Sequence, residues 1–218
     1  MPHQQMIVED AHERVGVFGA YGCGKTFATY QADEKHIMLT ENGETLIGAA
    51  TLIQLDNTIK KDLEGDFPGE FVFQYNRQKN MIQFQNNHKL YYRTMAEEGD
   101  IRSYNLSRAH LLEASEIKHE SYIQIQARVR NEAGTIPELN PDGSYIFDYD
   151  KISKRYKKRI KWKWLQTIIE SNPDSGWILG DVLLKSEEIS LHNIEDQEYY
   201  PDPLGVLKIM SSHIVPTK

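Results

Sequence analysis

The sequence predicts an α/β domain in which helices flank a mainly parallel central sheet. Three observations support this fold class. A short apolar segment, residues 14–18, leads into a glycine-rich loop, residues 19–26, and a helical pattern follows. Further strand-like segments recur at 45–49, 108–112 and 164–170, with helical patterns between some of them. At 218 residues, the chain is long enough for one such domain with a core of its own, and we predict a single domain over 1–218.

The composition limits the possible classes of protein. A net charge of −7 and an isoelectric point near 5.6 argue against coating of nucleic acid over the whole surface, so we expect any such contact to be local. The single cysteine, Cys23, excludes an intrachain disulfide and is typical of a reducing compartment. No apolar run approaches membrane-spanning length, and the N-terminus does not resemble a secretory signal. We therefore expect a soluble, intracellular protein.

The glycine-rich loop matches the phosphate-binding pattern G-x-x-x-x-G-K-[ST] at every fixed position. Its residues are Gly19, Ala20, Tyr21, Gly22, Cys23, Gly24, Lys25 and Thr26. In this setting backbone N–H groups would point at phosphate oxygens, Lys25 would neutralise the β- and γ-phosphates, and the Thr26 hydroxyl would ligate Mg²⁺. The loop therefore predicts a site for a nucleoside triphosphate and Mg²⁺.

Two glutamines, Gln4 and Gln5, precede the first strand. A glutamine amide can both donate to and accept from the edge of an adenine. The pair is equally consistent with ordinary surface residues.

The region from 45 to 93 predicts mostly structural elements. Thr45–Ala49 is strand-like, and Leu52, Leu55, Ile59 and Leu63 recur at helical spacing, which predicts an amphipathic helix from about Thr51 to Glu64. Three further strands are predicted at 71–73, 81–84 and 90–93, with a hairpin turn at Asn86-Asn87 between the last two.

A second informative stretch, residues 108–116, predicts a strand that ends in a carboxylate. At the end of a strand in the same sheet, Glu113 would lie beside the γ-phosphate, where a base can orient the attacking water. We assign His110 to burial or packing in the sheet. A helix is predicted over 117–129, and it delivers Arg128 and Arg130, which would either pair with surface carboxylates or reach a phosphate to stabilise charge in the transition state.

Between residues 131 and 163 we expect a loop-rich insertion. Its first part, to residue 150, contains turn residues, and in its second part eight of the thirteen residues from 151 to 163 are basic. In an acidic protein this is a concentrated basic patch, interleaved with aromatic residues, and it is the best candidate for a contact with a nucleic-acid backbone. A solvated charge run is the alternative. The candidate residues are Lys154, Arg155, Lys157, Lys158, Arg159 and Lys161.

The last predicted strand covers 164–170 and ends at Ser171, Asn172 and Pro173. Small polar residues at such a position can sense a γ-phosphate and shift a neighbouring element, although Asn-Pro is also an ordinary turn. A helix is expected from Trp177 to Ile189, and 199–203 is expected to be irregular.

Taken in order, these stretches resemble the ATPase domain of the large terminase subunit, the DNA-packaging motor of tailed bacteriophages. The resemblance runs over most of the chain, and after the phosphate-binding loop it lies in the ordered set rather than in any single motif. The segments that carry it are Pro2-His3-Gln4, the loop at 19–26, Gly48-Ala49-Ala50 with Gln54 and 58–63, 82–87, 111–117, 126–130, and 171–173 with Trp177.

The resemblance implies a RecA-like core that couples Mg²⁺-dependent ATP hydrolysis to movement of double-stranded DNA into a procapsid. It implies that Glu113 activates water, that Gln4 or Gln5 reads adenine, and that Ser171, Asn172 and Pro173 form the coupling motif. Because Leu112 stands where many members carry an acid, Mg²⁺ would be held by Thr26, phosphates and water, with Glu113 as a further candidate ligand. It further implies a homo-oligomeric ring on the portal protein, a small terminase subunit as partner, and a location in the host cytoplasm. In such a ring, Arg128 or Arg130 could act on a neighbouring subunit.

Three departures from the family pattern are visible. Leu112 stands where many members carry a metal-holding acid, and Tyr21 stands where many carry an arginine. The nuclease domain of full-length members is absent, so we expect a separated ATPase domain. Two alternatives remain from the sequence: a helicase-like ATPase stimulated by nucleic acid, and a nucleotide-binding assembly module with little turnover, the latter suggested by Leu112.

Overall fold

The computed structural model describes residues 2–19, 22–56, 69–95, 100–130, 134–172, 176–185, 188–193 and 206–211. Several predicted features lie outside these ranges. They are Ala20 and Tyr21 of the loop, Pro173, the helix expected at 51–64 beyond Asp56, and the irregular segment at 199–203.

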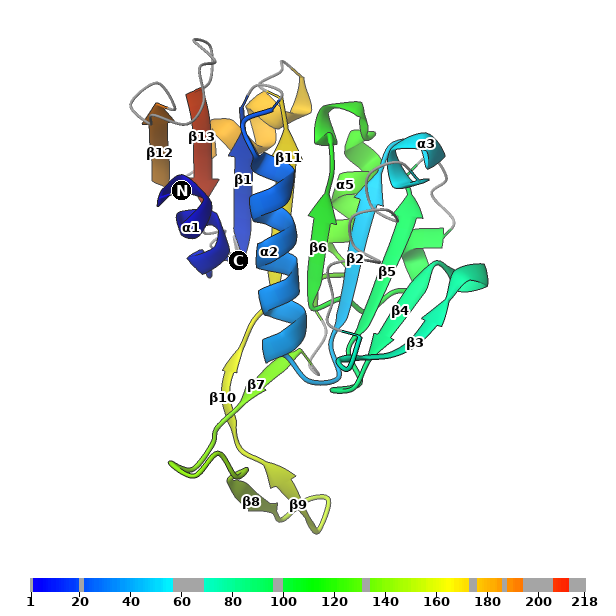
Figure 1. Cartoon of the computed structure of the whole chain (residues 1–218), viewed down its shortest axis with the longest axis vertical. Coiled ribbons are helices and arrows are strands. Elements are labelled where there is room, and N and C mark those ends of the chain that lie inside the picture. Colours follow the sequence, from blue (N-terminus) through cyan, green and yellow to red (C-terminus); the bar gives the residue numbers. More distant parts are fainter. Residues whose placement is uncertain are drawn as a thin grey trace.

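Within the described residues, nine strands form one sheet in the order β12-β13-β1-β11-β6-β2-β5-β4-β3 (Figure 1). The five central strands run parallel: β1 (Arg14–Phe18), β11 (Gln166–Ser171), β6 (Arg108–Leu111), β2 (Glu44–Ala49) and β5 (Lys89–Thr94). Antiparallel strands lie at both edges: β13 (Val206–Ser211), β12 (Glu188–Asn193), β4 (Met81–Phe84) and β3 (Val72–Asn76). The predicted parallel centre and the predicted hairpin between β4 and β5 are confirmed.

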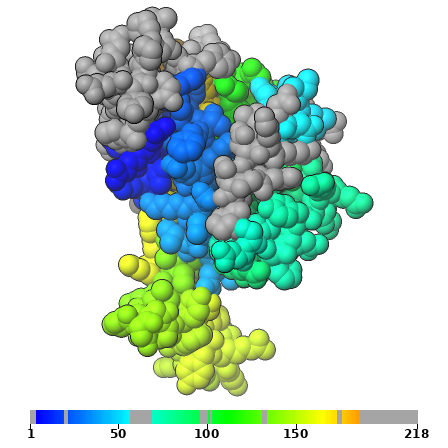
Figure 2. Space-filling view, in the orientation of Figure 1, coloured from blue at the N-terminus to red at the C-terminus, as the bar shows by residue number. Residues whose placement is uncertain are grey.

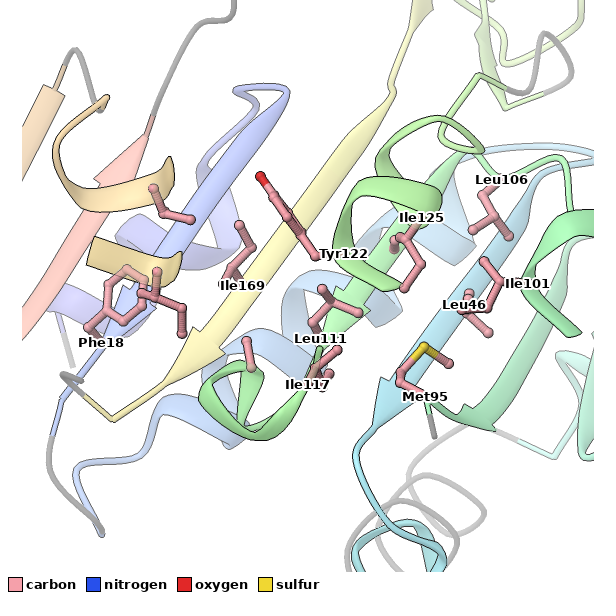
Figure 3. Packing of buried hydrophobic residues seen from close by; sticks show 14 residues of the cluster. Phe18, Leu46, Met95, Ile101, Leu106, Leu111, Ile117, Tyr122, Ile125 and Ile169 are labelled. Carbon is pink, nitrogen blue, oxygen red and sulfur yellow. The ribbon is translucent and has the colours of Figure 1, made fainter. Parts of the chain in front are cut away.

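Helices cover both faces of the sheet (Figure 1). On one face α2 (Lys25–Leu39) follows the loop, and its Ala28 and Ala32 pack against Val15, Val17 and Ile168 of the central strands. On the other face α5 (His119–Gln126) places Tyr122 and Ile125 in a second core with Leu111 and Ile169 (Figure 3). The short α1 (Pro2–Glu9) lies beside α2, where Lys35 donates to the Val8 carbonyl oxygen at 3.1 Å.

Short helical segments complete the fold. They are α3 (Leu52–Gln54) and the helical turns at Arg77–Lys79, Asp100–Ser103, Ala114–Glu116 and Leu179–Leu183. No helix in the described part of the chain is long and apolar enough to cross a membrane.

The expected helix from Trp177 to Ile189 is wrong in its second half. Helical structure ends at Leu183, and Glu188–Asn193 forms strand β12 instead. The segment Glu-Ile-Ser-Leu-His-Asn alternates polar and apolar residues with a period of two, which is the pattern of a strand. Pairing with β13 therefore decides the structure of these residues.

The described part of the expected loop-rich insertion, residues 134–163, contains strands that were not predicted. Residues 134–163 form an arm built from two antiparallel ladders: β7 (Thr135–Pro137) pairs with β10 (Ile160–Lys163), and β8 (Phe147–Asp150) pairs with β9 (Arg155–Lys158). The register sets acidic residues of β8 opposite basic residues of β9, and Lys157 forms an ion pair with Asp150 across the outer ladder. Turn residues in this segment predict loops, but the aromatic residues beside them favour strands.

The arm leaves the body at the amino edge of the sheet and projects away from it (Figures 1 and 2). It is inserted between α5 and β11, and two residues, Trp164 and Leu165, join β10 to β11. The phosphate-binding loop follows the last residue of β1, which lies at the carboxyl edge. The arm and the loop therefore lie at opposite ends of the central strands.

Candidate nucleotide site

The loop after β1 has the backbone geometry that a phosphate site needs. Gly22 and Gly24 have positive φ angles of 76° and 80°, a conformation that costs little only for glycine. Gly24 is the N-cap of α2, so the positive end of this helix opens onto the loop. The loop could therefore receive an anion at the carboxyl edge of the sheet.

Lys25, the first residue of α2, turns back across the loop. Only 5% of its surface is exposed, and its ammonium group donates to the Gly19 carbonyl oxygen at 2.9 Å and to Asn172 Oδ1 at 3.3 Å. Asn172 directly follows β11. The end of the neighbouring strand thus contacts the lysine expected to bind the β- and γ-phosphates.

Glu113 lies at the end of β6, on the same edge of the sheet. Its φ angle is 46°, a left-handed conformation that is uncommon for a glutamate and is found preferentially at functional sites. Burial raises the pKa of Glu113 above its ordinary value, against the opposing effects of Lys25 and of a backbone hydrogen bond from Asn172. A raised pKa on a half-buried carboxyl is typical of a catalytic base.

The ends of β6 and β11 are held together beside the loop. The Ser115 backbone N–H, two residues beyond Glu113, donates to Ser171 Oγ at 3.2 Å. On the other side, the Gly19 N–H donates to the Ser171 carbonyl oxygen at 3.4 Å. The structure therefore brings Lys25, Glu113, Ser171 and Asn172 together.

Thr26 has a partner that the sequence analysis missed. Its hydroxyl donates to Glu170 Oε1 at 2.5 Å, and the Thr29 hydroxyl, one turn along α2, donates to Glu170 Oε2 at 2.8 Å. Glu170 belongs to β11 and is only 1% exposed. Hydrogen bonds from His110, Thr26 and Thr29 hold the pKa of Glu170 below its ordinary value in spite of its burial.

Glu170 is one end of a buried network of charged side chains. His110 lies 3.2 Å from Glu170 through Nε2 and 2.6 Å from Asp33 through Nδ1, and Arg108 donates to Asp33 at 2.6 Å. Burial alone would lower the pKa of His110, but the two carboxylates raise it to about 9. The network thus contains two acids and two bases, a balance that burial demands. His110 is buried, as the sequence predicted.

The two candidate adenine-reading glutamines differ in position. Gln4 Nε2 lies 2.7 Å from where a Cβ on Gly24 would stand, so the Gln4 side chain is beside the loop. Gln5 donates to Glu9 at 2.9 Å within the same helix and is exposed. Of the two, only Gln4 lies next to the site.

Arg128 and Arg130 are not part of this cluster. The Leu106 N–H donates to the Arg128 carbonyl oxygen and the Arg130 N–H donates to the Leu106 carbonyl oxygen, each at 2.8 Å. Leu106 precedes β6, so both arginines lie at the amino edge of the sheet. Their predicted role at a phosphate would therefore require a neighbouring subunit.

The basic residues of the arm fall into two groups. Lys157 pairs with Asp150, Lys158 with Glu41 at 2.6 Å, and Arg159 with Asp148 at 2.7 Å. Lys154, Arg155 and Lys161 are exposed and form no ion pair with other described residues. Residues 134–163 hold eight basic and four acidic side chains, a net charge of +4 in a chain of net charge −7.

The donor set at the loop fits Mg²⁺ bound together with a nucleotide. Mg²⁺ is usually held by one or two protein side chains together with phosphates and water. The Thr26 hydroxyl and the Glu113 carboxylate supply oxygen donors at this edge, and Thr26 is bonded to Glu170. The described residues contain no cluster of three acidic, histidine or cysteine side chains that could hold a metal without a nucleotide.

We compared the chain with known protein families, curated sequences and solved structures. No protein-family model and no curated sequence matches the chain. Among solved structures, the large terminase of a thermophilic bacteriophage matches with a TM-score of 0.59 at 14% identity, over 84% of this chain and 42% of that one. The large terminase ATPase domain of Thermus phage P74-26 matches with a TM-score of 0.56 at 14% identity, over 84% of this chain and 69% of that one.

A third phage gives the same result: the HK97 bacteriophage large terminase matches with a TM-score of 0.51 at 13% identity, over 78% of this chain and 33% of that one. The chain therefore has the fold of large terminase ATPase domains, a P-loop NTPase fold with a RecA-like core, as predicted. It spans about two fifths of the first of these large terminases, which has also been crystallised with ADP and with ATP-gamma-S.

Proposed function

We propose that this chain is the ATP-hydrolysing domain of a DNA-packaging motor of the large terminase type. One observation carries the proposal: the ends of two neighbouring strands bring Glu113 and Asn172 against Lys25 of the phosphate-binding loop. Such an arrangement can bind a triphosphate, orient a water and register the state of the γ-phosphate. The fold shared with phage terminase ATPase domains supports packaging as the process that hydrolysis drives.

In this proposal each residue of the site has one task. The loop N–H groups and Lys25 bind the β- and γ-phosphates, and Mg²⁺, bound through Thr26, supplies positive charge to the phosphates. Glu113 accepts a proton from the attacking water. Asn172 contacts both Lys25 and Glu113, so loss of the γ-phosphate would change the contacts of Asn172 at the end of β11. Gln4, beside the loop, is the candidate for contact with adenine.

In this proposal the arm binds double-stranded DNA. Lys154, Arg155 and Lys161 form no ion pairs with other described residues and offer positive charge that can contact DNA phosphates without first breaking such a pair. Arg128 or Arg130 would reach the site of an adjacent subunit in a ring. Portal protein and small terminase subunit would be the partners of that ring in the host cytoplasm.

ATP hydrolysis tests the central claim. We expect the wild-type chain to hydrolyse ATP with Mg²⁺ over a range of protein concentrations, and Glu113→Gln to bind ATP but lose turnover by about 10²–10⁴-fold. Lys25→Ala should lose triphosphate affinity or turnover, and wild-type behaviour in that variant would refute the site. Stimulation by single-stranded rather than duplex DNA would favour a helicase-like ATPase instead.

A further inference from the structure

We propose that Glu170 is the carboxylate that positions Thr26 for Mg²⁺, in place of the acid that the sequence lacks at Leu112. This inference rests on the proposed function, because it requires a Mg²⁺-nucleotide at the loop. Glu170 would be a positioning residue, acting through the Thr26 hydroxyl rather than by ligating the metal itself.

The register of the sheet explains how one strand can replace another. β11 and β6 are parallel neighbours in which Ile168 pairs with His110 and Ile169 with Leu111. Glu170 and Leu112 each come one residue after this last pair. They therefore hold corresponding positions at the ends of two neighbouring strands.

Both positions also face the same helix. Leu112 packs in a cluster with Tyr30 of α2, and Glu170 accepts hydrogen bonds from Thr26 and Thr29 of α2. Both side chains are buried, at 5% and 1% exposure. Glu170 thus lies on the face of the sheet that carries the phosphate-binding helix.

A hydroxyl that ligates a metal offers an oxygen lone pair and must point its proton elsewhere. A neighbouring acceptor fixes that direction, as other outer-shell partners do for metal ligands. The 2.5 Å bond to Glu170 supplies a charged acceptor for the Thr26 proton, and such charge-assisted bonds are the stronger ones. With its proton held in this way, Thr26 keeps a lone pair available for Mg²⁺.

The remaining contacts explain why Glu170 acts indirectly. Its Oε1 already accepts from Thr26, and its Oε2 accepts from Thr29 while His110 Nε2 lies 3.2 Å away. These partners fix the carboxylate in place and leave it turned toward α2. Asp33 and Arg108 hold His110 from behind, so the buried network gives Glu170 a fixed position.

The test compares nucleotide binding with and without metal. Calorimetry would measure ADP affinity in Mn²⁺ and in EDTA, and the ratio of the two affinities reports coupling between metal and nucleotide. We expect Glu170→Gln to lower this ratio about tenfold or more, while the ADP affinity measured in EDTA changes little. The electron paramagnetic resonance spectrum of bound Mn²⁺ should change in the same variant, a signature that loss of stability alone would not give.

A double-mutant cycle tests the route through Thr26. Thr26→Ala should lower the ratio by itself, and Glu170→Gln should add little in the Thr26→Ala background, because the bond it disrupts is already absent. Thr29→Val is the comparison variant: it removes the other hydroxyl bonded to Glu170 but no proposed metal ligand, so it should lower the ratio less than Thr26→Ala does. Independent, additive losses would contradict the proposal.

Folding and function can be told apart in this design. If Glu170→Gln does not fold, Glu170→Asp keeps a negative charge opposite His110 but shortens the reach to Thr26, and it should lower the ratio as well. An unchanged ratio in either folded variant overturns the inference. Failure of the wild-type chain to bind ADP in any condition would instead overturn the proposed function.

Discussion

The ammonium group of Lys25 lies 3.3 Å from the side-chain oxygen of Asn172. The Asn172 backbone also forms a hydrogen bond to the Glu113 carboxyl group, which helps to lower the pKa of that group. Asn172 therefore connects Lys25 of the loop to the candidate base, Glu113. A γ-phosphate would compete with Asn172 for the Lys25 ammonium.

Asn172→Ala should reduce ATP turnover while leaving nucleotide affinity within a few-fold of wild type. Hydrogen bonds to charged groups contribute about 1.5–3 kcal/mol, so we expect kcat to fall about 10–100-fold. Steady-state hydrolysis and equilibrium binding of ATP would separate the two quantities. If kcat is retained, Asn172 has no part in hydrolysis.

The pH dependence of hydrolysis should report the pKa of Glu113. A base must be ionised, and burial raises the pKa of Glu113 above 4.5, so turnover should decline on acidification at a higher pH than an ordinary glutamate would give. The measurement is kcat at saturating ATP across the acidic range, with circular dichroism to confirm that the chain stays folded. If kcat declines only at or below pH 4.5, Glu113 is not the base.

Stability should fall in alkaline solution because of His110. Its pKa is about 9 in the folded chain against 6.5 as the reference, so its stabilising charge is fully present below pH 6.5 and is lost as pH rises through 9. One pKa unit corresponds to about 1.4 kcal/mol. The free energy of unfolding should therefore fall by about 3 kcal/mol as His110 loses its charge. Urea unfolding between pH 6 and 10 would test this. His110→Gln should flatten the pH profile, and an equally steep profile in that variant would assign the loss to other groups.

Binding of duplex DNA should depend on those basic side chains of the arm that form no ion pair with other described residues. Each phosphate contact contributes about 0.9 to the slope of log affinity against log salt, so replacing Lys154, Arg155 and Lys161 with glutamine should lower the slope by up to about 3. The matched variant replaces Lys157, Lys158 and Arg159 with glutamine; it removes the same charge, but from residues already paired with carboxylates, and should lower the slope less. If the slope of log affinity against log salt is the same in the wild type and both variants, the basic side chains of the arm are solvated and do not contact DNA.

Cys23 offers a direct probe of site occupancy. It lies within the loop, and burial raises the pKa of its thiol above 9.0, so alkylation at neutral pH should be slower than for a free thiol and should accelerate as pH rises. ATP should protect Cys23 from alkylation if the loop closes around phosphates. Mass spectrometry can follow the reaction, with Lys25→Ala as the variant in which protection should disappear.

Much of the fold could be predicted from local sequence. The loop motif located β1 and α2, because glycine adopts the positive φ angles at Gly22 and Gly24 at little cost and the motif requires a strand-loop-helix arrangement. Alternating patterns likewise located β4 and β5. The arm was missed because turn residues such as Asn140, Pro141 and Gly143 lie close to aromatic residues, and cross-strand pairing decided between the two signals.

The site was only partly predictable, for a different reason. Glu113 could be placed from its own strand, but the relation between Glu170 and Thr26 depends on which strand lies beside which, and that order is not local information. A signal did exist: charged residues at 108, 110 and 170 interrupt segments that are otherwise apolar. Fully buried charges need partners, so such interruptions indicate a network even when its members cannot be matched from sequence.

Strand β11 connects the arm to the candidate nucleotide site. At one end this strand follows β10 of the arm after two residues, and at its other end it leads into Asn172 beside Lys25. All six of its residues are buried, and at about 3.3 Å per residue they span about 20 Å. An extended strand clamped between two neighbours hardly stretches along its axis. The arm and the residues beside Lys25 are therefore joined by one short, buried strand whose length changes little.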